Sequence, residues 1–202
     1  ENEYIKNINM YRYMDGSIEE LSDKIIVENW ITLYLNGITL FESPVSAKEI
    51  KELIYGVLYI KSYIDEEDKE DILEYIVEKN NAYISLHKHI EVKNYRDILD
   101  YFNEESDLHN EIKKIPINKR FSINRILELM SDFQELPSLY KDTGGTHMAA
   151  LVKNRISLWA EDISRKNAFN KLIGKAFLEG KMPLDDRFII FSGRVSAELI
   201  AK

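Results

Sequence analysis

Three short polar segments in the last third of the chain carry residue types that could bind an anion. The first is Thr143-Gly144-Gly145-Thr146-His147. Glycines let backbone N–H groups approach a phosphate closely, and hydroxyl groups add hydrogen-bond donors. The same residue types are also typical of a plain turn, and both interpretations stay open for this segment taken alone.

The second segment runs from Glu161 to Asn167, where a predicted strand meets a predicted helix. A carboxylate such as Asp162 is favoured at a helix N-terminus by the helix dipole, so capping alone would explain it. Arg165, Lys166 and Asn167 stand in the same first turn, where cations are unfavourable unless an anion binds there. The segment therefore favours an anion site, in which Glu161 or Asp162 would hydrogen-bond a base or a ribose hydroxyl.

The third segment, Ser192-Gly193-Arg194, follows a short apolar strand and precedes a predicted helix. Its arginine could clamp a phosphate or a carboxylate. One such turn carries little information, but three at one sheet edge are more than chance would give.

The order of the surrounding elements predicts where these segments lie. Strands are predicted at Met148–Val152, Ile156–Ala160 and Phe188–Phe191, with a helix ending at Gly180 between the last two and a final helix after Arg194. The strand–helix–strand order implies a right-handed crossover and parallel neighbouring strands. Ligands bind at the carboxyl ends of such strands, where the three polar segments should meet.

The first half of the chain is predicted to contain several strands. Asn36-Gly37 is its strongest hairpin signal, because both residues tolerate positive φ. The predicted strands are Lys24–Val27, Trp30–Leu35, Ile38–Phe41, Ile72–Val77 and Ala82–Ile90, with an earlier turn at Asp15-Gly16.

Two further helices are expected from capping residues and apolar spacing. Ser46 is interpreted as an N-cap, with Glu49 completing the capping box of a helix that runs to about Ile60. Ser122 caps a second helix. Its apolar positions are predicted to be Ile126, Leu127, Met130 and Phe133. Residues 94–117, before it, form a polar stretch typical of a long loop.

Composition narrows the classes of function. Of the 202 residues, 45% are hydrophobic and 31% are charged, which is typical of a folded domain. The net charge of −8 disfavours nucleic acids and anionic membranes as partners. No apolar run approaches the ~20 residues that span a bilayer. We therefore expect a cytoplasmic protein with no nucleic-acid partner and no membrane partner.

The sequence contains no cysteine, which removes disulfides, thiolate metal sites and thiol nucleophiles. His87 and His89 share one face of a predicted strand and would be half of a metal site, but a solvated strand edge is the favoured interpretation. No metal site is therefore expected. The G-x-S-x-G, Walker A and G-x-G-x-x-G patterns are absent.

Together the three polar segments resemble the motifs of the formate dehydrogenase accessory sulfurtransferases, the FdhD/NarQ family. The stretch from Thr143 to Leu151 is similar to T-G-G-x-H-x-A-A-L. The stretch from Glu161 to Ala168, with Lys171 and Gly174, resembles E-D-V-G-R-H-N-A-x-D-K-x-x-G. The last segment resembles S-G-R-x-S-x-E-L-x-x-K through Ser192, Gly193, Arg194, Ser196, Glu198, Leu199 and Lys202.

This resemblance implies an α/β fold, with a cytidine-deaminase-like mixed sheet and flanking helices plus a small N-terminal subdomain of strands and helix. We place the subdomain at residues 1–120 and the core at residues 121–202. The family carries sulfur from a cysteine desulfurase to the molybdenum bis(molybdopterin guanine dinucleotide) cofactor, serves a molybdoenzyme such as formate dehydrogenase, and acts as a homodimer. The cofactor-binding residues implied here are Thr143, Gly144, Gly145, His147, Glu161, Asp162, Arg165, Lys166, Asn167, Lys171, Ser192, Gly193 and Arg194.

The chain departs from the family pattern at points that bear on chemistry. The family's sulfur-carrying cysteine lies in a C-x-x-C loop before the T-G-G motif, and the matching stretch within Tyr101–Phe121 has no cysteine. Lys166, Ser164 and Asn170 replace a histidine, a glycine and an aspartate of the family. The sequence also ends at Lys202, where the family continues, so we expect either a fragment or an incomplete nucleotide site.

Three hypotheses follow. The first is an FdhD-like accessory protein that binds molybdopterin guanine dinucleotide or GDP without a persulfide of its own, so that no residue is given a catalytic role and enzyme activity stays open. The alternative is a non-catalytic partner of a molybdoenzyme or of a cysteine-bearing FdhD paralogue. A deaminase-type hydrolase is least favoured, because the H-x-E and C-x-x-C zinc ligands are missing.

Overall fold

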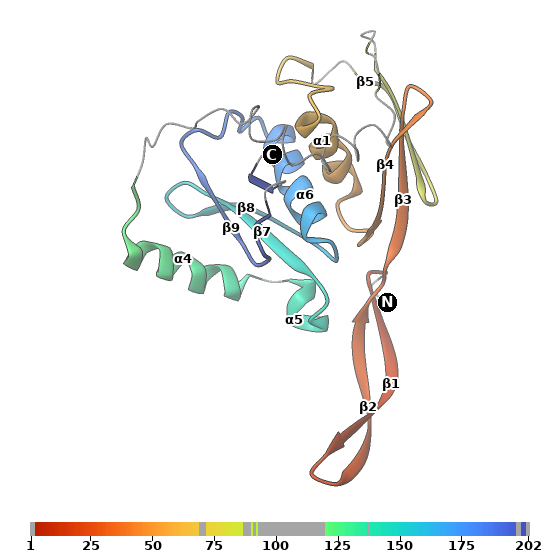
Figure 1. Cartoon of the computed structure of the whole chain (residues 1–202), viewed down its shortest axis with the longest axis vertical. Helices are drawn as coiled ribbons and strands as arrows, with labels where there is room; N and C mark the ends of the chain where they lie inside the picture. The colour runs from red at the N-terminus through yellow and green to blue at the C-terminus, as the bar shows by residue number, and fades with distance from the viewer. Residues whose placement is uncertain are drawn as a thin grey trace.

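The computed structural model describes residues 3–68, 72–86, 90, 92, 120–136, 138–196 and 199–200. Two helices lie between two β-sheets, and a hairpin extends away from the rest of the molecule (Figure 1). The two helices are α1 (Ile50–Ile60) and α6 (Arg165–Leu178). The predicted class, an α/β fold with a mixed sheet and flanking helices, is confirmed.

A three-stranded sheet packs on α6. Its strands are β7 (His147–Val152), β8 (Ile156–Asp162) and β9 (Phe188–Phe191), in the order β8-β7-β9. Successive side chains of a strand point to opposite faces. Ala149 and Leu151 therefore pack against α6, whereas Ala150 and Val152 pack against helix α4 (Ile123–Glu135) on the other face.

The strand directions of this sheet differ from the prediction. β7 pairs antiparallel with both β8 and β9, so neighbouring strands are not parallel. β8 and β9 do run in the same direction and are connected through α6, but β7 lies between them. The tight turn at residues 153–155 joins β7 to β8 as a hairpin and leaves the other edge of β7 for β9.

Helix α4 begins where the sequence predicts. The side chain of Ser122 accepts a hydrogen bond of 3.2 Å from the backbone N–H of Arg125 and caps the helix. Phe133 is buried against the three-stranded sheet, as expected. The prediction that Ile126 and Leu127 lie on the buried face is wrong, because Ile126 is 39% exposed and Leu127 is 62% exposed. The sheet covers only a narrow stripe of this helix.

A four-stranded sheet packs on α1. Its strands, in the order β4-β3-β6-β5, are β3 (Asn29–Leu35), β4 (Ile38–Val45), β5 (Ile72–Glu78) and β6 (Asn81–Leu86). β3 is antiparallel to β4 and parallel to β6, so the sheet is mixed. Asn36 and Gly37 have φ angles of 49° and 81°, which confirms the predicted hairpin. Ile31, Leu33 and Leu35 alternate into the core beneath α1.

The largest departure from the predicted elements lies near the N-terminus. β1 (Ile5–Met14) and β2 (Ser17–Ile26) form a long two-stranded antiparallel hairpin that projects from the body (Figure 1). The sequence predicts only its turn at Asp15-Gly16 and a strand at Lys24–Val27. Both faces of the hairpin mix apolar and polar residues, so no period of two is visible. The short helix α5 (Leu139–Thr143) was not predicted either.

Several predictions fall outside the described residues. They are the candidate metal pair His87 and His89, the polar loop at residues 94–117 and most of the final helix, of which residues 199–200 are described as helical. Within the described part of the chain, no helix is both long enough and apolar enough to cross a membrane.

Helices α1 and α6 cross with their backbones in contact. A Cβ atom added to Gly56 would lie 1.8 Å from the carbonyl oxygen of Asn170. A Cβ atom added to Gly174 would lie 1.8 Å from the carbonyl oxygen of Glu52. No side chain fits at either position, so these two glycines set the distance between the helices.

Gly174→Ala should force the two helices apart. We expect the free energy of unfolding to fall by about 1–3 kcal/mol or more, as overpacking does. Urea unfolding followed by circular dichroism measures this change. Asn124→Ala on exposed α4 is the control and should stay within about 0.5 kcal/mol of the wild type. A Gly174→Ala protein as stable as the control would contradict the close crossing.

Candidate functional site

The three polar segments meet at one end of the strands of the three-stranded sheet. Because β7 is antiparallel to both neighbours, its start lies beside the ends of β8 and β9. His147 pairs in register with Asp162. Ser192 donates its backbone N–H to the Met148 carbonyl at 3.0 Å and accepts the Met148 N–H on Oγ at 2.8 Å. The gathering that the sequence predicts is observed, on an antiparallel sheet.

A cavity of about 330 Å³ opens where the turns meet. It is lined by Tyr140, Gly144, Gly145, Thr146, His147 and Ser192. Its volume lies at the low end of the range for small-molecule sites. Gly144 ends α5 with a φ of 66°, a left-handed conformation that favours glycine. Backbone groups therefore make up much of this wall.

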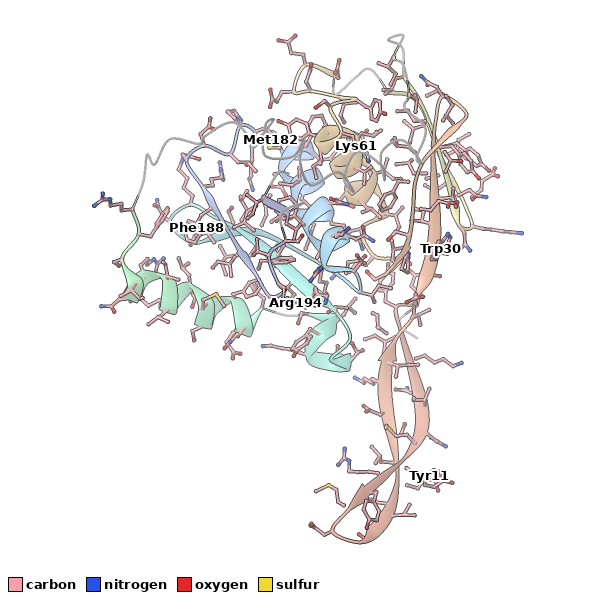
Figure 2. All side chains as sticks on the ribbon, viewed as in Figure 1. Tyr11, Trp30, Lys61, Met182, Phe188 and Arg194 are labelled. Carbon is pink, nitrogen blue, oxygen red and sulfur yellow. The ribbon has the colours of Figure 1, made fainter. Side chains whose placement is uncertain are left out.

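Two arginines belong to the segments around this cavity. A Cβ atom added to Gly193 would lie 3.3 Å from the Cβ atom of Arg165, so the turn after β9 packs against the start of α6. Arg194, in the same turn, is exposed and lies beyond the end of β9, whereas Phe188 begins that strand (Figure 2). Within the described residues, the side chains of Arg165 and Arg194 form no hydrogen bond or ion pair. Local positive charge thus adjoins Ser192 on a chain of net charge −8.

Glu161 is fully buried and holds the cavity wall. Its two carboxylate oxygens each accept the backbone N–H of Leu139 at 2.9 Å, and one accepts the Thr146 hydroxyl at 3.3 Å. The ammonium group of Lys48 lies 3.4 Å from the carboxylate and offsets its charge. Leu139 begins α5 and Thr146 precedes β7, so Glu161 fixes both ends of the segment that lines the cavity.

Asp162 and Lys171 form a fully buried ion pair, with 2.6 Å between Oδ2 and Nζ. Lys171 also donates to the carbonyl and hydroxyl oxygens of Ser46, at 3.0 Å each. Asp162 accepts the backbone N–H groups of Ser46 at 3.1 Å and Ser164 at 2.8 Å. Burial lowers the pKa of Lys171, and the Asp162 carboxylate opposes that shift. Each buried charge therefore has an opposite charge and further hydrogen-bond partners, as burial requires.

Asn167 continues this network. Its side-chain amide donates to the hydroxyl of Ser43 at 2.8 Å and to the carbonyl of Pro44 at 3.0 Å. These two residues lie near the end of β4, and Ser46 comes directly after that strand. Asn167 and Lys171 therefore attach the β4–α1 connection to α6.

The predicted site residues divide into two groups. Gly144, Gly145, His147 and Ser192 line the cavity, whereas Arg165, Lys166, Gly193 and Arg194 do not line it but are exposed or half-buried. Those that are buried and bonded within the protein are Glu161, Asp162, Asn167 and Lys171. Thr143 stands between the groups, because its hydroxyl donates to Leu139 and accepts the Gly145 N–H. Ligand contact stays a prediction for all of them.

Comparison with known proteins assigns the family. The sequence matches the FdhD/NarQ family over residues 26–202. The chain belongs to this family. It is 28% identical over 207 residues to the sulfur carrier protein FdhD of Bacillus subtilis, and the match covers 96% of this chain and 77% of that protein. The FdhD of Wolinella succinogenes is 27% identical over 214 residues, covering 98% and 73%.

The fold of this FdhD/NarQ member also matches a solved structure. The crystal structure of a protein from Desulfotalea psychrophila, described as a formate dehydrogenase accessory protein, superposes with a TM-score of 0.75. It shares 18% sequence identity and is matched over 98% of this chain and 79% of its own. The cavity of this family member is lined by residues of its T-G-G-x-H and S-G-R motifs. Among the residues described, no three His, Asp or Glu side chains are placed to hold a metal ion.

The prediction that Ser46 caps α1 is wrong. Ser46 is buried against Asp162 and Lys171. The cap position of α1 is Glu49, which has a φ of 61° and forms no side-chain cap hydrogen bond. Glu49 instead forms an ion pair of 2.6 Å with Lys175. Ser46 and Glu49 both bond to lysines of α6, Ser46 to Lys171 and Glu49 to Lys175. No local sequence signal distinguishes these tertiary contacts from a capping box.

Two cavity residues were also left out of the predicted site. Tyr140 lies on α5, a helix of 5 residues that is too short to give a periodic pattern. Thr146 was noted only as a hydroxyl of the turn, although it both lines the cavity and bonds Glu161. Its place inside the T-G-G-T-H run was the available signal.

Lys171→Met tests whether the buried ion pair holds this site. The variant leaves the Asp162 charge buried without its cation, so the free energy of unfolding should fall by about 3–5 kcal/mol. Lys181→Met is the matched control, because Lys181 pairs with exposed Glu179 at the surface and should contribute under ~1 kcal/mol. Chemical denaturation of the two variants measures the difference, and equal stabilities would rule out the structural role.

Proposed function

We propose that this FdhD/NarQ member is an accessory protein for the maturation of formate dehydrogenase and binds the guanine nucleotide part of the molybdenum bis(molybdopterin guanine dinucleotide) cofactor. One observation carries the proposal: the Gly144–Gly145 turn and the turn at Ser192 line a single cavity, and the start of α6, with Arg165, packs against the second of these turns. The names of the relatives, sulfur carrier protein FdhD and formate dehydrogenase accessory protein, support the choice of pathway.

The chemistry of the cavity suits a phosphate. The Gly144–Gly145 turn has no side chain to keep a ligand from the backbone, and the Ser192 hydroxyl accepts the Met148 N–H while its own hydrogen can be donated. Arg165 and Arg194 would supply charge-assisted hydrogen bonds to phosphate oxygens. A cavity of about 330 Å³ takes one nucleotide portion, and the pterin part of the cargo would lie outside it.

In this proposal the buried residues position the turns and do not touch the ligand. Glu161 holds the wall from Leu139 to Thr146, and the Asp162–Lys171 pair holds the start of α6. Glu161 and Asp162 would then not hydrogen-bond a base or a ribose. The residues that would contact the ligand are Tyr140, His147, Ser192, Arg165 and Arg194.

Arg194→Ala tests the nucleotide site. Losing a charge-assisted hydrogen bond of roughly 1.5–3 kcal/mol should raise the Kd for GDP about 10- to 100-fold in calorimetric titration. Arg155→Ala is the matched control, because Arg155 is an exposed arginine in the turn at the opposite edge of the sheet. Wild-type protein that does not bind GDP, or a control that weakens as much as Arg194→Ala, would contradict the site.

The proposal assigns no sulfur-carrying residue to these 202 residues, because they include no cysteine. We expect the purified chain to take up no label from a cysteine desulfurase supplied with radiolabelled cysteine, whereas a cysteine-bearing FdhD should be labelled in parallel. Gel filtration without reductant measures the retained label. Stoichiometric labelling of the chain would overturn this part of the proposal.

The missing cysteine also favours a second candidate function. The chain would act as the non-catalytic partner of a molybdoenzyme or of a cysteine-bearing FdhD copy, with the sulfur carried by that copy. Pull-down from native extract distinguishes the two functions, because only this one predicts a stable protein complex together with no binding of GDP.

A further inference from the structure

The hairpin of β1 and β2 contacts the cavity wall at its base. Ile26, the last residue of β2, packs against Gly145, because a Cβ atom added to Gly145 would lie 2.8 Å from Ile26 Cγ2 and 3.6 Å from Ile26 Cβ. Lys24 lies on the same face of β2 and forms an ion pair of 3.4 Å with Asp142 of α5. Figure 1 shows α5 beside the body end of the hairpin. This face of the hairpin base therefore lies against the segment that lines the cavity.

Of these two contacts, the one made by Ile26 is the stronger. The side chains of Lys24 and Asp142 are 52% and 49% exposed, so their ion pair contributes little. Ile26 is half-buried, and its branched side chain has few χ1 rotamers, so the position of its backbone determines where Cγ2 lies. Gly145 has no left-handed backbone, unlike Gly144. The space that Ile26 occupies, and not the backbone conformation, therefore excludes a side chain at position 145.

The pairing of the two strands fixes the position of Ile26. Ile26 is the cross-strand partner of Ile5, and the next residue, Val27, donates its N–H to the Tyr4 carbonyl at 2.9 Å. A two-stranded hairpin is marginally stable by itself in water, so the base of this one depends on its packing against the body. The order of the hairpin and the position of Ile26 therefore depend on each other.

The contact with Ile26 supports a part of the cavity wall that Glu161 does not hold. Glu161 bonds the Leu139 N–H and the Thr146 hydroxyl, which lie on either side of the glycine turn. Between these two points, the Gly145 N–H donates at 3.2 Å to the Thr143 hydroxyl, a group of the same segment. Ile26 is the contact that reaches the middle of the turn from another element.

We propose that Ile26 is a positioning residue for the Gly144–Gly145 turn, and that the hairpin and the ligand cavity are coupled through this contact. The inference rests on the proposed function, in which the backbone of this turn binds the phosphates of the ligand. Backbone N–H groups bind a phosphate only when they are held in a converging arrangement. A hairpin base that moves away from Gly145 would release that arrangement and weaken binding. Because coupling between two sites is reciprocal, a bound ligand should also stabilise the hairpin base.

Hydrogen exchange of the ligand-free protein tests the positioning role by itself. Ile26→Ser should speed exchange of the backbone amides of residues 144–147 at least about 10-fold, because the turn loses its packing against the hairpin. Ile26→Val keeps Cβ and Cγ2 and should stay within about threefold of the wild type. Ile18→Ser, at a position 73% exposed near the other end of the same strand, is the matched control and should also stay within about threefold.

The amides in the middle of α6 report on unfolding of the whole domain in the same experiment. Their exchange should be the same in the wild type and in all three variants, because the loosening is confined to the turn. Equal exchange at residues 144–147 in the wild type and Ile26→Ser would overturn the positioning role. Exchange that rises as much in α6 as in the turn, or as much in Ile18→Ser as in Ile26→Ser, would overturn it too.

A double-mutant cycle tests the steric contact between Ile26 and Gly145. Gly145→Ala in the wild-type background should speed exchange of the turn amides at least about fivefold, because the new methyl group collides with Ile26 Cγ2. In the Ile26→Ala background this collision is gone, and the same change should alter exchange less than about twofold. The next nearest atom, Thr143 Oγ1 at 3.5 Å, lies at ordinary contact distance. Equal effects of Gly145→Ala in the two backgrounds would contradict the contact.

Calorimetric titration with GDP then tests the coupling. Ile26→Ser should raise the Kd for GDP about 5- to 20-fold, whereas Ile26→Val and Ile18→Ser should leave it within about twofold. In the wild type, saturating GDP should slow exchange of the Val27 amide, which closes the hairpin base. Equal GDP affinity in the wild type and Ile26→Ser would overturn the coupling. A wild type that binds no GDP would contradict the proposed function, and the exchange experiments would then decide the role of Ile26 by themselves.

Discussion

The ion pair between Asp162 and Lys171 is the constraint on which the rest of the molecule depends. It lies at the point where the last residue of β8, the first turns of α6 and the connection from β4 to α1 come together. Both charges are fully buried, so the fold keeps them only if all their partners remain in place. Ser46, in the connection from β4 to α1, supplies three of these hydrogen-bonding groups, namely its N–H, its carbonyl and its hydroxyl. The pair thereby joins the two halves of the chain.

The same arrangement explains why the cavity has its shape. Glu161, next to Asp162 in sequence, points to α5 and Thr146 and holds the glycine turn, while Asp162 fixes the beginning of α6. Below them Gly56 and Gly174 let α1 and α6 meet at backbone distance, which brings Ser46 within reach of Lys171. The residues proposed to contact a ligand are thus positioned by buried residues to which no ligand contact is assigned.

How far the sequence predicts this structure depends on the range of the interactions. Local signals predicted the hairpin at Asn36-Gly37 and the cap at Ser122. The gathering of the polar turns was predicted from parallel neighbouring strands, and it occurs although those strands are antiparallel. The order of strands in the three-stranded sheet could not be predicted in this way, because the pairing of β9 with β7 joins strands that are far apart in the sequence. Ser46 was misassigned because its partners lie 116 and 125 residues away in the chain. The hairpin of β1 and β2 was missed because no core selects which of its faces is apolar.

The family motifs predicted the site residues without distinguishing their roles. The E-D and K positions of the second motif are Glu161, Asp162 and Lys171, and all three side chains are buried. Asp162 and Lys171 form an ion pair, and Glu161 bonds the segment that lines the cavity. The glycines and arginines of the turns, namely Gly144, Gly145, Gly193, Arg165 and Arg194, are exposed or half-buried. The motifs thus contain both the residues proposed to bind a ligand and the buried residues that position them, and burial distinguishes these two classes.

The most direct test of this account is a crystal structure of the protein with GDP. The account predicts a diphosphate at the Gly144–Gly145 turn, within hydrogen-bonding distance of Ser192 and Arg194, with the Asp162–Lys171 pair intact and no ligand contact to Glu161. A nucleotide bound at another surface, or one that displaces Lys171 from Asp162 to reach its phosphates, would contradict it.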